Sequence, residues 1–270
     1  MKKWILPLLA VAAAGGIAVV CAGQTEADGG SASVRVIGLE VVKPLPGDKQ
    51  KQSLTGRRTG TVLTVQVHRA DKHFLGLDAS ECRLETFSDD RGVELVDDSA
   101  KMLQTWVEDR TWVSRDGHRC AFELRAARCP SRGARRLEFR GTVVLKVGQQ
   151  RQTAEQANFR LAKDGKLTAG PVPMEITGVQ VDAKGAIFCL SARKSTDRIA
   201  QILFFGPDGK EIESELVEKS IVGFMGNTFH ERTYRLTSKR RLRAVTARVV
   251  YFKRIKTLSV PLRVAAGVGL

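Results

Sequence analysis

Residues 137–147, LEFRGTVVLKV, alternate apolar and polar side chains over most of their length. This period of two is typical of a β-strand with one face buried, because successive side chains of a strand point to opposite faces. The same alternation recurs on both sides of this stretch, whereas no long apolar stripe with a helical period does. The stretch therefore predicts an all-β chain.

Working outward from it, four further segments of the first half predict strands of the same kind. They are residues 34–41, 62–67, 82–84 and 120–124. Turn sequences rich in Asp, Gly and Pro separate them, at 44–48, 89–92, 116–117 and 130–133. Short strands with regular turns favour a β-sandwich.

The second half repeats this layout in the same order, which we interpret as an internal duplication. Residues 60–63 correspond to 185–188, 87–95 to 205–212, 122–125 to 234–236, and 135–146 to 240–253. The segment 164–173 is rich in Gly and Pro and lacks periodicity, so it predicts a connection between domains. We expect a first domain over 33–163, a second over 174–264 and a tail over 265–270.

This layout of Asp-Gly hairpins, a late Arg-Leu strand pair and the closing stretch 259–264 resembles tandem immunoglobulin-like or fibronectin-type modules of exported bacterial proteins. The resemblance covers residues 33–264. It implies two consecutive immunoglobulin-like β-sandwiches, and it implies no chemistry.

The first 22 residues have the composition of a secretory signal peptide. Lys2 and Lys3 precede an uncharged run from Trp4 to Ala22, and a polar stretch follows. We expect cleavage after Ala22, then a flexible linker over 23–32. Acylation of Cys21, as in a lipoprotein, and an uncleaved anchor remain as alternatives. No second apolar run is long enough to span a bilayer, so we expect no transmembrane segment in the mature chain.

The chain is strongly basic, with a formal net charge of +15 over 270 residues. Removal of the leader takes away two lysines and no acidic residue, which leaves +13. Two clusters of basic residues occupy corresponding regions of the two halves. The members that we take as candidate anion-binding residues are Arg125, Arg128, Arg135, Arg136 and Arg140 in the first cluster, and Lys239, Arg240, Arg241 and Arg243 in the second.

An exported basic protein meets anionic polysaccharides, envelope phosphates and acidic proteins, which such a field attracts. We therefore expect an anionic polysaccharide or an envelope protein as partner, and no nucleic acid. The alternative is a solvated strand face, on which charge also opposes aggregation.

Trp106 and Trp112 form a second candidate site. They are six residues apart, so on one extended strand they would share a face and could stack on sugar rings. The alternative is that they cover the core or the edge of the sandwich.

Four cysteines follow the predicted leader, in a compartment that permits disulfides. An antiparallel arrangement of the strands at 82–84 and 120–124 favours a disulfide between Cys82 and Cys129; buried thiols are the alternative. His68 and His73 flank Asp71, a spacing that lacks the geometry of a metal site.

No nucleophile, phosphate-loop or metal motif is present in the sequence, so we expect neither a cofactor nor a metal, and no enzyme activity. Two functions remain: a noncatalytic binding or adhesion module of the bacterial envelope, or a purely structural spacer. An enzyme that acts on polysaccharide or depends on a metal is a distant third.

Overall fold

The computed structural model describes residues 24–26, 32–43, 59–224, 226–239 and 241–268. Over this part the chain is all-β, with antiparallel sheets and two short helices, η1 (Ala79–Glu81) and α1 (Asp98–Met102). The signal peptide predicted over residues 1–22 lies outside the described residues. Within the predicted linker, Gln24–Glu26 form strand β1, which pairs with the start of β2.

The first half of the chain builds two facing sheets. One has the strand order β1-β2-β3-β7-β6, formed by β2 (Ser33–Val42), β3 (Gly60–His68), β7 (Arg119–Ala126) and β6 (Val107–Val113) next to β1. The other is formed by β4 (His73–Leu77) and β5 (Arg83–Asp89), both paired with β8 (Arg136–Arg160), which in turn pairs with β15 (Ala244–Gly267). A core that includes Phe87, Phe122 and Phe139 lies between the sheets.

The second half repeats this arrangement. Its first layer has the order β9-β10-β11-β14-β13, formed by β9 (Lys166–Leu167), β10 (Met174–Asp182), β11 (Gly185–Ala192), β14 (Asn227–Thr237) and β13 (Glu211–Phe224). Its second layer contains β12 (Ile199–Phe205), β15 and β8. Strand β12 also pairs with β13, through Phe204↔Ile212 and Phe205↔Glu211, so the two layers belong to one continuous sheet. The orders β2-β3-β7-β6 and β10-β11-β14-β13 therefore correspond strand for strand, as do β5-β8-β15 and β12-β15-β8. This is the arrangement expected of an internal duplication.

Two glycines mark equivalent positions in the halves. Gly60 opens β3 with φ +139°, and Gly185 opens β11 with φ +145°. A Cβ atom would lie 2.2 Å from the carbonyl oxygen of Ala126 at the first position and 1.9 Å from that of Leu236 at the second. Only glycine fits either site, since the facing strand approaches too closely for a side chain.

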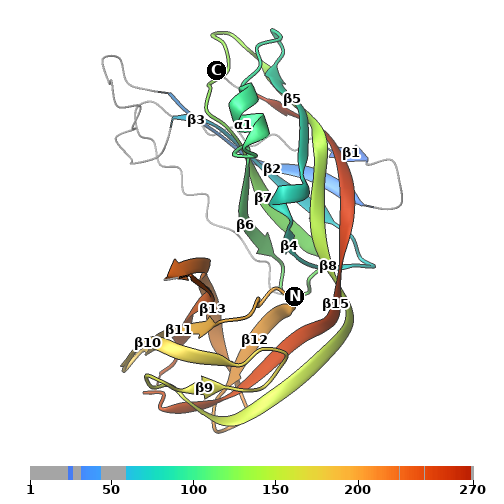
Figure 1. The fold of residues 1–270 in the computed structure, drawn as a ribbon. Coiled ribbons are helices and arrows are strands. Elements are labelled where there is room, and N and C mark those ends of the chain that lie inside the picture. The colour runs from blue at the N-terminus through green and yellow to red at the C-terminus, as the bar shows by residue number, and fades with distance from the viewer. Residues whose placement is uncertain (1–23, 27–31, 44–58, 225, 240, 269–270) are drawn as a thin grey trace, which may run out of the picture.

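The halves exchange their last strands (Figure 1). Strand β8 begins in the first core and ends in the second, where Phe159 is fully buried. Strand β15 begins in the second core and ends in the first, to which it contributes Val260, Leu262, Val264 and Ala266. The two strands pair from Arg136↔Gly267 to Arg160↔Ala244, so one continuous ladder joins both cores.

The strand exchange changes the domain boundaries. Residues 164–173, predicted as a connection, place Leu167 and Val172 in the second core, and Ala266 and Val268 of the predicted tail lie in the first. A division into 33–163 and 174–264 assigns both crossing strand ends to the opposite core. Sequence alternation indicates that a strand is half-buried, and it carries no information about which core buries it.

Candidate functional site

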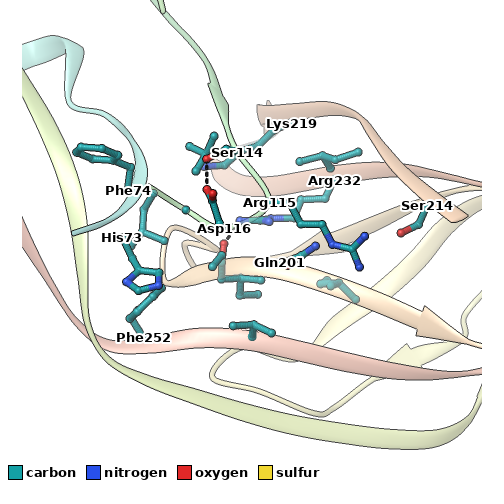
Figure 2. Close-up of a pocket in the computed structure, with 18 of the residues that line it drawn as sticks. His73, Phe74, Ser114, Arg115, Asp116, Gln201, Ser214, Lys219, Arg232 and Phe252 are labelled. Carbon is teal, nitrogen blue, oxygen red and sulfur yellow. Dashed lines mark hydrogen bonds between the residues drawn. The ribbon is translucent and has the colours of Figure 1, made fainter. Parts of the chain in front are cut away.

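A cavity of about 410 Å³ lies where the two halves meet. The first half lines it with β4, the turn between β6 and β7, and the middle of β8, while the second half contributes β12, β13, β14 and β15 (Figure 2). Its size is within the usual range for small-molecule sites, about 300–1,000 Å³. The polar and charged residues of its wall are His73, Thr111, Ser114, Arg115, Asp116, Arg151, Gln201, Glu211, Glu213, Ser214, Lys219, Arg232 and Tyr234.

Ion pairs between the halves lie beside this cavity. Arg115, in the β6–β7 turn, pairs with Glu211 at the start of β13. Asp197 bridges Lys146 of β8, at 3.2 Å, and Lys219 of β13, at 3.3 Å. Burial acts to raise the pKa of Asp197, but the two ammonium groups outweigh it, and the net pKa is below the ordinary value. Asp197 is therefore a carboxylate at neutral pH, already engaged by two lysines.

Aromatic rings form one wall of the cavity. The ring of His73 lies 4.6 Å from that of His118 and 5.6 Å from that of Phe252, measured between centroids. Burial lowers the pKa of His73, and the nearby His118 and Arg151 act in the same direction. The His73 ring is therefore neutral at pH 7, and it adds an aromatic surface to this wall rather than a charge.

The opposite wall contains a buried cation. Arg232, at the centre of β14, is 3% exposed. Its Nε donates to Oγ1 of Thr196 at 3.2 Å, and its Nη2 donates to the carbonyl oxygens of Thr196 and Ile199, each at 2.8 Å. All three acceptors are neutral.

The two predicted basic clusters lie at opposite ends of the molecule. Arg136 begins β8 and pairs with Gly267, whereas Arg243 directly precedes β15, whose first residue pairs with Arg160. Along the ladder these ends are separated by roughly 80 Å of strand, at about 3.4 Å per residue. The clusters therefore do not form one surface. Arg240 lies outside the described residues.

The clusters also differ in how far their charges are neutralised. In the first, Arg125 pairs with Glu123 at 2.7 Å, and Arg136 and Arg140 share Glu138 at 3.7 and 3.8 Å. In the second, none of the described members Lys239, Arg241 and Arg243 has a carboxylate oxygen within 4.0 Å. Arg128 and Arg135 of the first cluster have no such carboxylate among the described residues either, so charge is left uncompensated for part of the first cluster and for every described member of the second.

Sequence reasoning missed two residues of this second end. The ladder register places Arg160 opposite Ala244, and the backbone N–H of Ser238 donates to the carbonyl of Lys184, so both cations lie beside the second cluster. Both side chains are exposed. We call Arg160, Lys184, Lys239, Arg241 and Arg243 together the outer basic surface. Cross-strand pairing brought these residues together, and only the basic character of each segment was visible in sequence.

The predicted tryptophan pair does not form. Trp106 is 1% exposed and packs against Phe139 in the first core, whereas Trp112 is 47% exposed. The pairing of β6 with β7 shifts register between Val107 and Thr111. Between these pairs β6 advances by four residues and β7 by two, so β6 is not regularly extended between the two tryptophans and their rings do not share a face.

The predicted disulfide between Cys82 and Cys129 is also absent, and both residues are thiols. The Cys82 Sγ donates to the carbonyl of Asp78 and accepts from the N–H of Val144, at 3.3 Å each, while the Cys129 Sγ donates to the carbonyl of Val42 at 3.2 Å. The prediction assumed that the strand after Cys82 pairs with β7. That strand, β5, pairs with β8 in the facing sheet instead.

The His68, Asp71 and His73 group does not bind as a unit. Asp71 pairs with Arg69 and Lys72, at 2.9 Å each, and hydrogen bonds from these two lower its pKa to about 2. Within the described residues, no three His, Cys, Asp or Glu side chains gather in a way that could hold a metal ion. Nor does any helix of that part have the length and apolar character needed to cross a membrane.

No family model matches this chain, and neither does any curated protein or solved structure.

Proposed function

We propose that this chain is an exported, noncatalytic binding protein of the bacterial envelope, which holds an anionic polymer on the outer basic surface. The proposal includes a signal peptide over residues 1–22 and an immunoglobulin-like sandwich in each half. Antiparallel sheets around two cores, the basic composition and the leader-like N-terminus support it.

The observation that carries the proposal is the difference between the two ends. The five cations of the outer basic surface come from three separate segments, and no carboxylate among the described residues lies within 4.0 Å of them. At the equivalent end of the first half, three of the five candidate arginines lie within 4.0 Å of Glu123 or Glu138. Uncompensated cations at one end concentrate a positive potential there.

An anionic polymer suits this surface better than a compact ligand. The cations are exposed side chains on strand ends and turns, without an enclosing wall, so they can follow a flexible chain of negative charges. Contacts of this kind are screened by salt, with a screening length of about 10 Å at 0.1 M. Sulfated or uronic polysaccharides and polymers of sugar phosphates carry charge at a suitable density.

The test compares two charge-matched double variants on a sulfated-polysaccharide resin. Arg241→Ala/Arg243→Ala should bind about tenfold or more weakly at low salt, since each exposed cation contributes on the order of 1 kcal/mol near a dense anionic surface. Arg136→Ala/Arg140→Ala removes the same formal charge at the other end and should bind like the wild type. Equal weakening of both variants would show attraction by net charge alone and would contradict the proposal.

A structural spacer is the second candidate. The continuous β8–β15 ladder favours it, because a strand pair that runs through both cores resists bending at the joint. A spacer requires no ligand, so the wild-type protein would then elute from the resin at a salt concentration set by its net charge, independent of which end carries the substitutions.

A further inference from the structure

The cavity between the halves contains a buried charge that the protein leaves without an anion. No carboxylate of the described residues lies within 4.0 Å of the Arg232 guanidinium, and its three hydrogen bonds go to a hydroxyl and two carbonyl groups. A buried arginine without a counter-ion is costly even when it is hydrogen-bonded. Its retention at the wall of a cavity therefore calls for a ligand that supplies the charge.

One nitrogen of the guanidinium is available for that ligand. The three hydrogen bonds use Nε and both N–H groups of Nη2, and Nη1 takes part in none of them. Nη1 has no hydrogen-bond partner among the described residues, and it is not fully enclosed by protein atoms, so it faces accessible space. Arg232 lines the cavity, and the cavity is that space.

The surroundings restrict the ligand to one negative charge. Lys219 lies directly opposite Arg232 in the β13–β14 ladder and adds a second cation, but Asp197 already engages it at 3.3 Å. Of the other cations of the wall, Arg115 is paired with Glu211, and the Arg151 side chain is exposed. Glu213 and Asp116 line the same cavity and would repel a second negative charge. A dianion such as phosphate at pH 8 would thus meet one buried guanidinium edge, the exposed Arg151 and two carboxylates.

The remaining walls favour a ligand with a flat apolar body. The rings of His73 and Phe252 are in contact with each other, and Leu216 and Tyr234 approach from the second half. A cavity of about 410 Å³ is large enough for an aromatic or branched carboxylic acid.

We propose that this cavity is a binding site for a small organic monocarboxylate, whose carboxylate accepts from Arg232 Nη1 while its apolar part lies against Phe252 and His73. The site is distinct from the outer basic surface and shares no residue with it. The protein would thus have two anion sites of different kinds: an open surface for a polymer and a cavity at the joint for a single small acid.

Benzoate is the probe that tests the site, and inorganic phosphate at pH 8 is the dianion with which its binding is compared. We expect saturable binding of benzoate to the full mature chain with a Kd of about 1 mM or tighter, as its small size allows, and at least tenfold weaker binding of phosphate. The imidazole NMR signals of His73 should shift with benzoate, and those of the exposed His68 should not.

Replacement of Arg232 risks misfolding, so the variant test uses the half-buried Gln201 of the same wall. Gln201→Glu adds a carboxylate to the cavity and should weaken benzoate binding by at least tenfold. Gln66→Glu, an equally half-buried site in the first sheet, is the matched control and should bind like the wild type. Absence of saturable benzoate binding below about 10 mM, or equal affinity in the Gln201→Glu variant, would overturn the proposal. Either result leaves the polymer test unaffected, since that test uses other residues.

Discussion

The ring of Phe252 lies directly over Gly148, so that a Cβ atom at position 148 would come within 2.3 Å of the Phe252 Cγ. The two residues lie on the neighbouring strands β8 and β15 at the joint between the halves, where Gly148 pairs with Ile255 and Phe252 with Arg151, and Phe252 also lines the cavity. Close contact between backbone and ring thus fixes one wall of the proposed carboxylate site.

Substitution of this glycine should destabilise the joint. In Gly148→Ala the new methyl group overlaps the Phe252 ring, and we expect a loss of about 2–3 kcal/mol in the free energy of unfolding, measured by urea denaturation. The double variant Gly148→Ala/Phe252→Leu removes the overlap and should recover part of the loss. A Gly148→Ala protein as stable as the wild type would show that the ring is not held against this residue.

A buried carboxylate should make stability depend on pH. Asp89 is 3% exposed and accepts hydrogen bonds from the backbone N–H groups of Arg91, Val93 and Ser131 and from the Ser131 hydroxyl. Burial raises its pKa, but these hydrogen bonds outweigh burial and place the net pKa below 3.8. Because the folded pKa is depressed, the stabilisation is present above the unfolded pKa of about 3.9 and is lost as the pH falls through the folded value.

Asp89→Asn tests this directly. It leaves two of the four donors facing an amide nitrogen, so we expect a loss of about 2–3 kcal/mol at pH 6. The difference in unfolding free energy between wild type and variant should narrow below about pH 4. A difference that stays constant from pH 6 to pH 3 would mean that the carboxylate charge does not stabilise this turn.

The cysteines should react as separate thiols of different reactivity. Burial raises the pKa of Cys120 to about 12. With an unfolded value of about 8.5, its alkylation by iodoacetamide at pH 8 should be about a thousandfold or more slower in the native protein than in urea. Mass spectrometry after labelling in urea without a reductant should find Cys82, Cys120, Cys129 and Cys189 all modified. Protection of Cys82 and Cys129 from alkylation under those conditions would contradict this and would support the predicted disulfide between them.

The strands could largely be predicted from sequence, because alternation of apolar and polar residues follows from a half-buried strand. The pairing partner of each strand could not be predicted in this way. Leu63 pairs with Leu124, and its counterpart Phe188 pairs with Tyr234. Tyr234 is therefore the structural counterpart of Leu124, whereas the comparison of the two sequence halves had aligned it two residues earlier. The exchange of β8 and β15 between the halves could not be predicted from the alternation of apolar and polar residues, since either core can bury the same alternating side chains.

One residue of the cavity wall could have been recognised from the sequence. Arg232 occupies an inward-facing position of β14, in register with the buried Tyr234 and Leu236. An arginine at an apolar position of a strand is unusual, because burial of its charge is costly. What the sequence could not indicate was that Thr196 and Ile199 would accept its hydrogen bonds and leave one edge toward the joint.

We propose that the outer basic surface, and not the basic character of the whole chain, holds a polyanion. Hydrogen–deuterium exchange with and without a sulfated dodecasaccharide, at about 50 mM salt, tests it most directly, since weak screening preserves such contacts. We predict slower exchange in the turns at 161–165, 182–184 and 241–243, with no change in the turn at 131–135. Slower exchange at 131–135 alone, or no localised change at any of these turns, would contradict the claim.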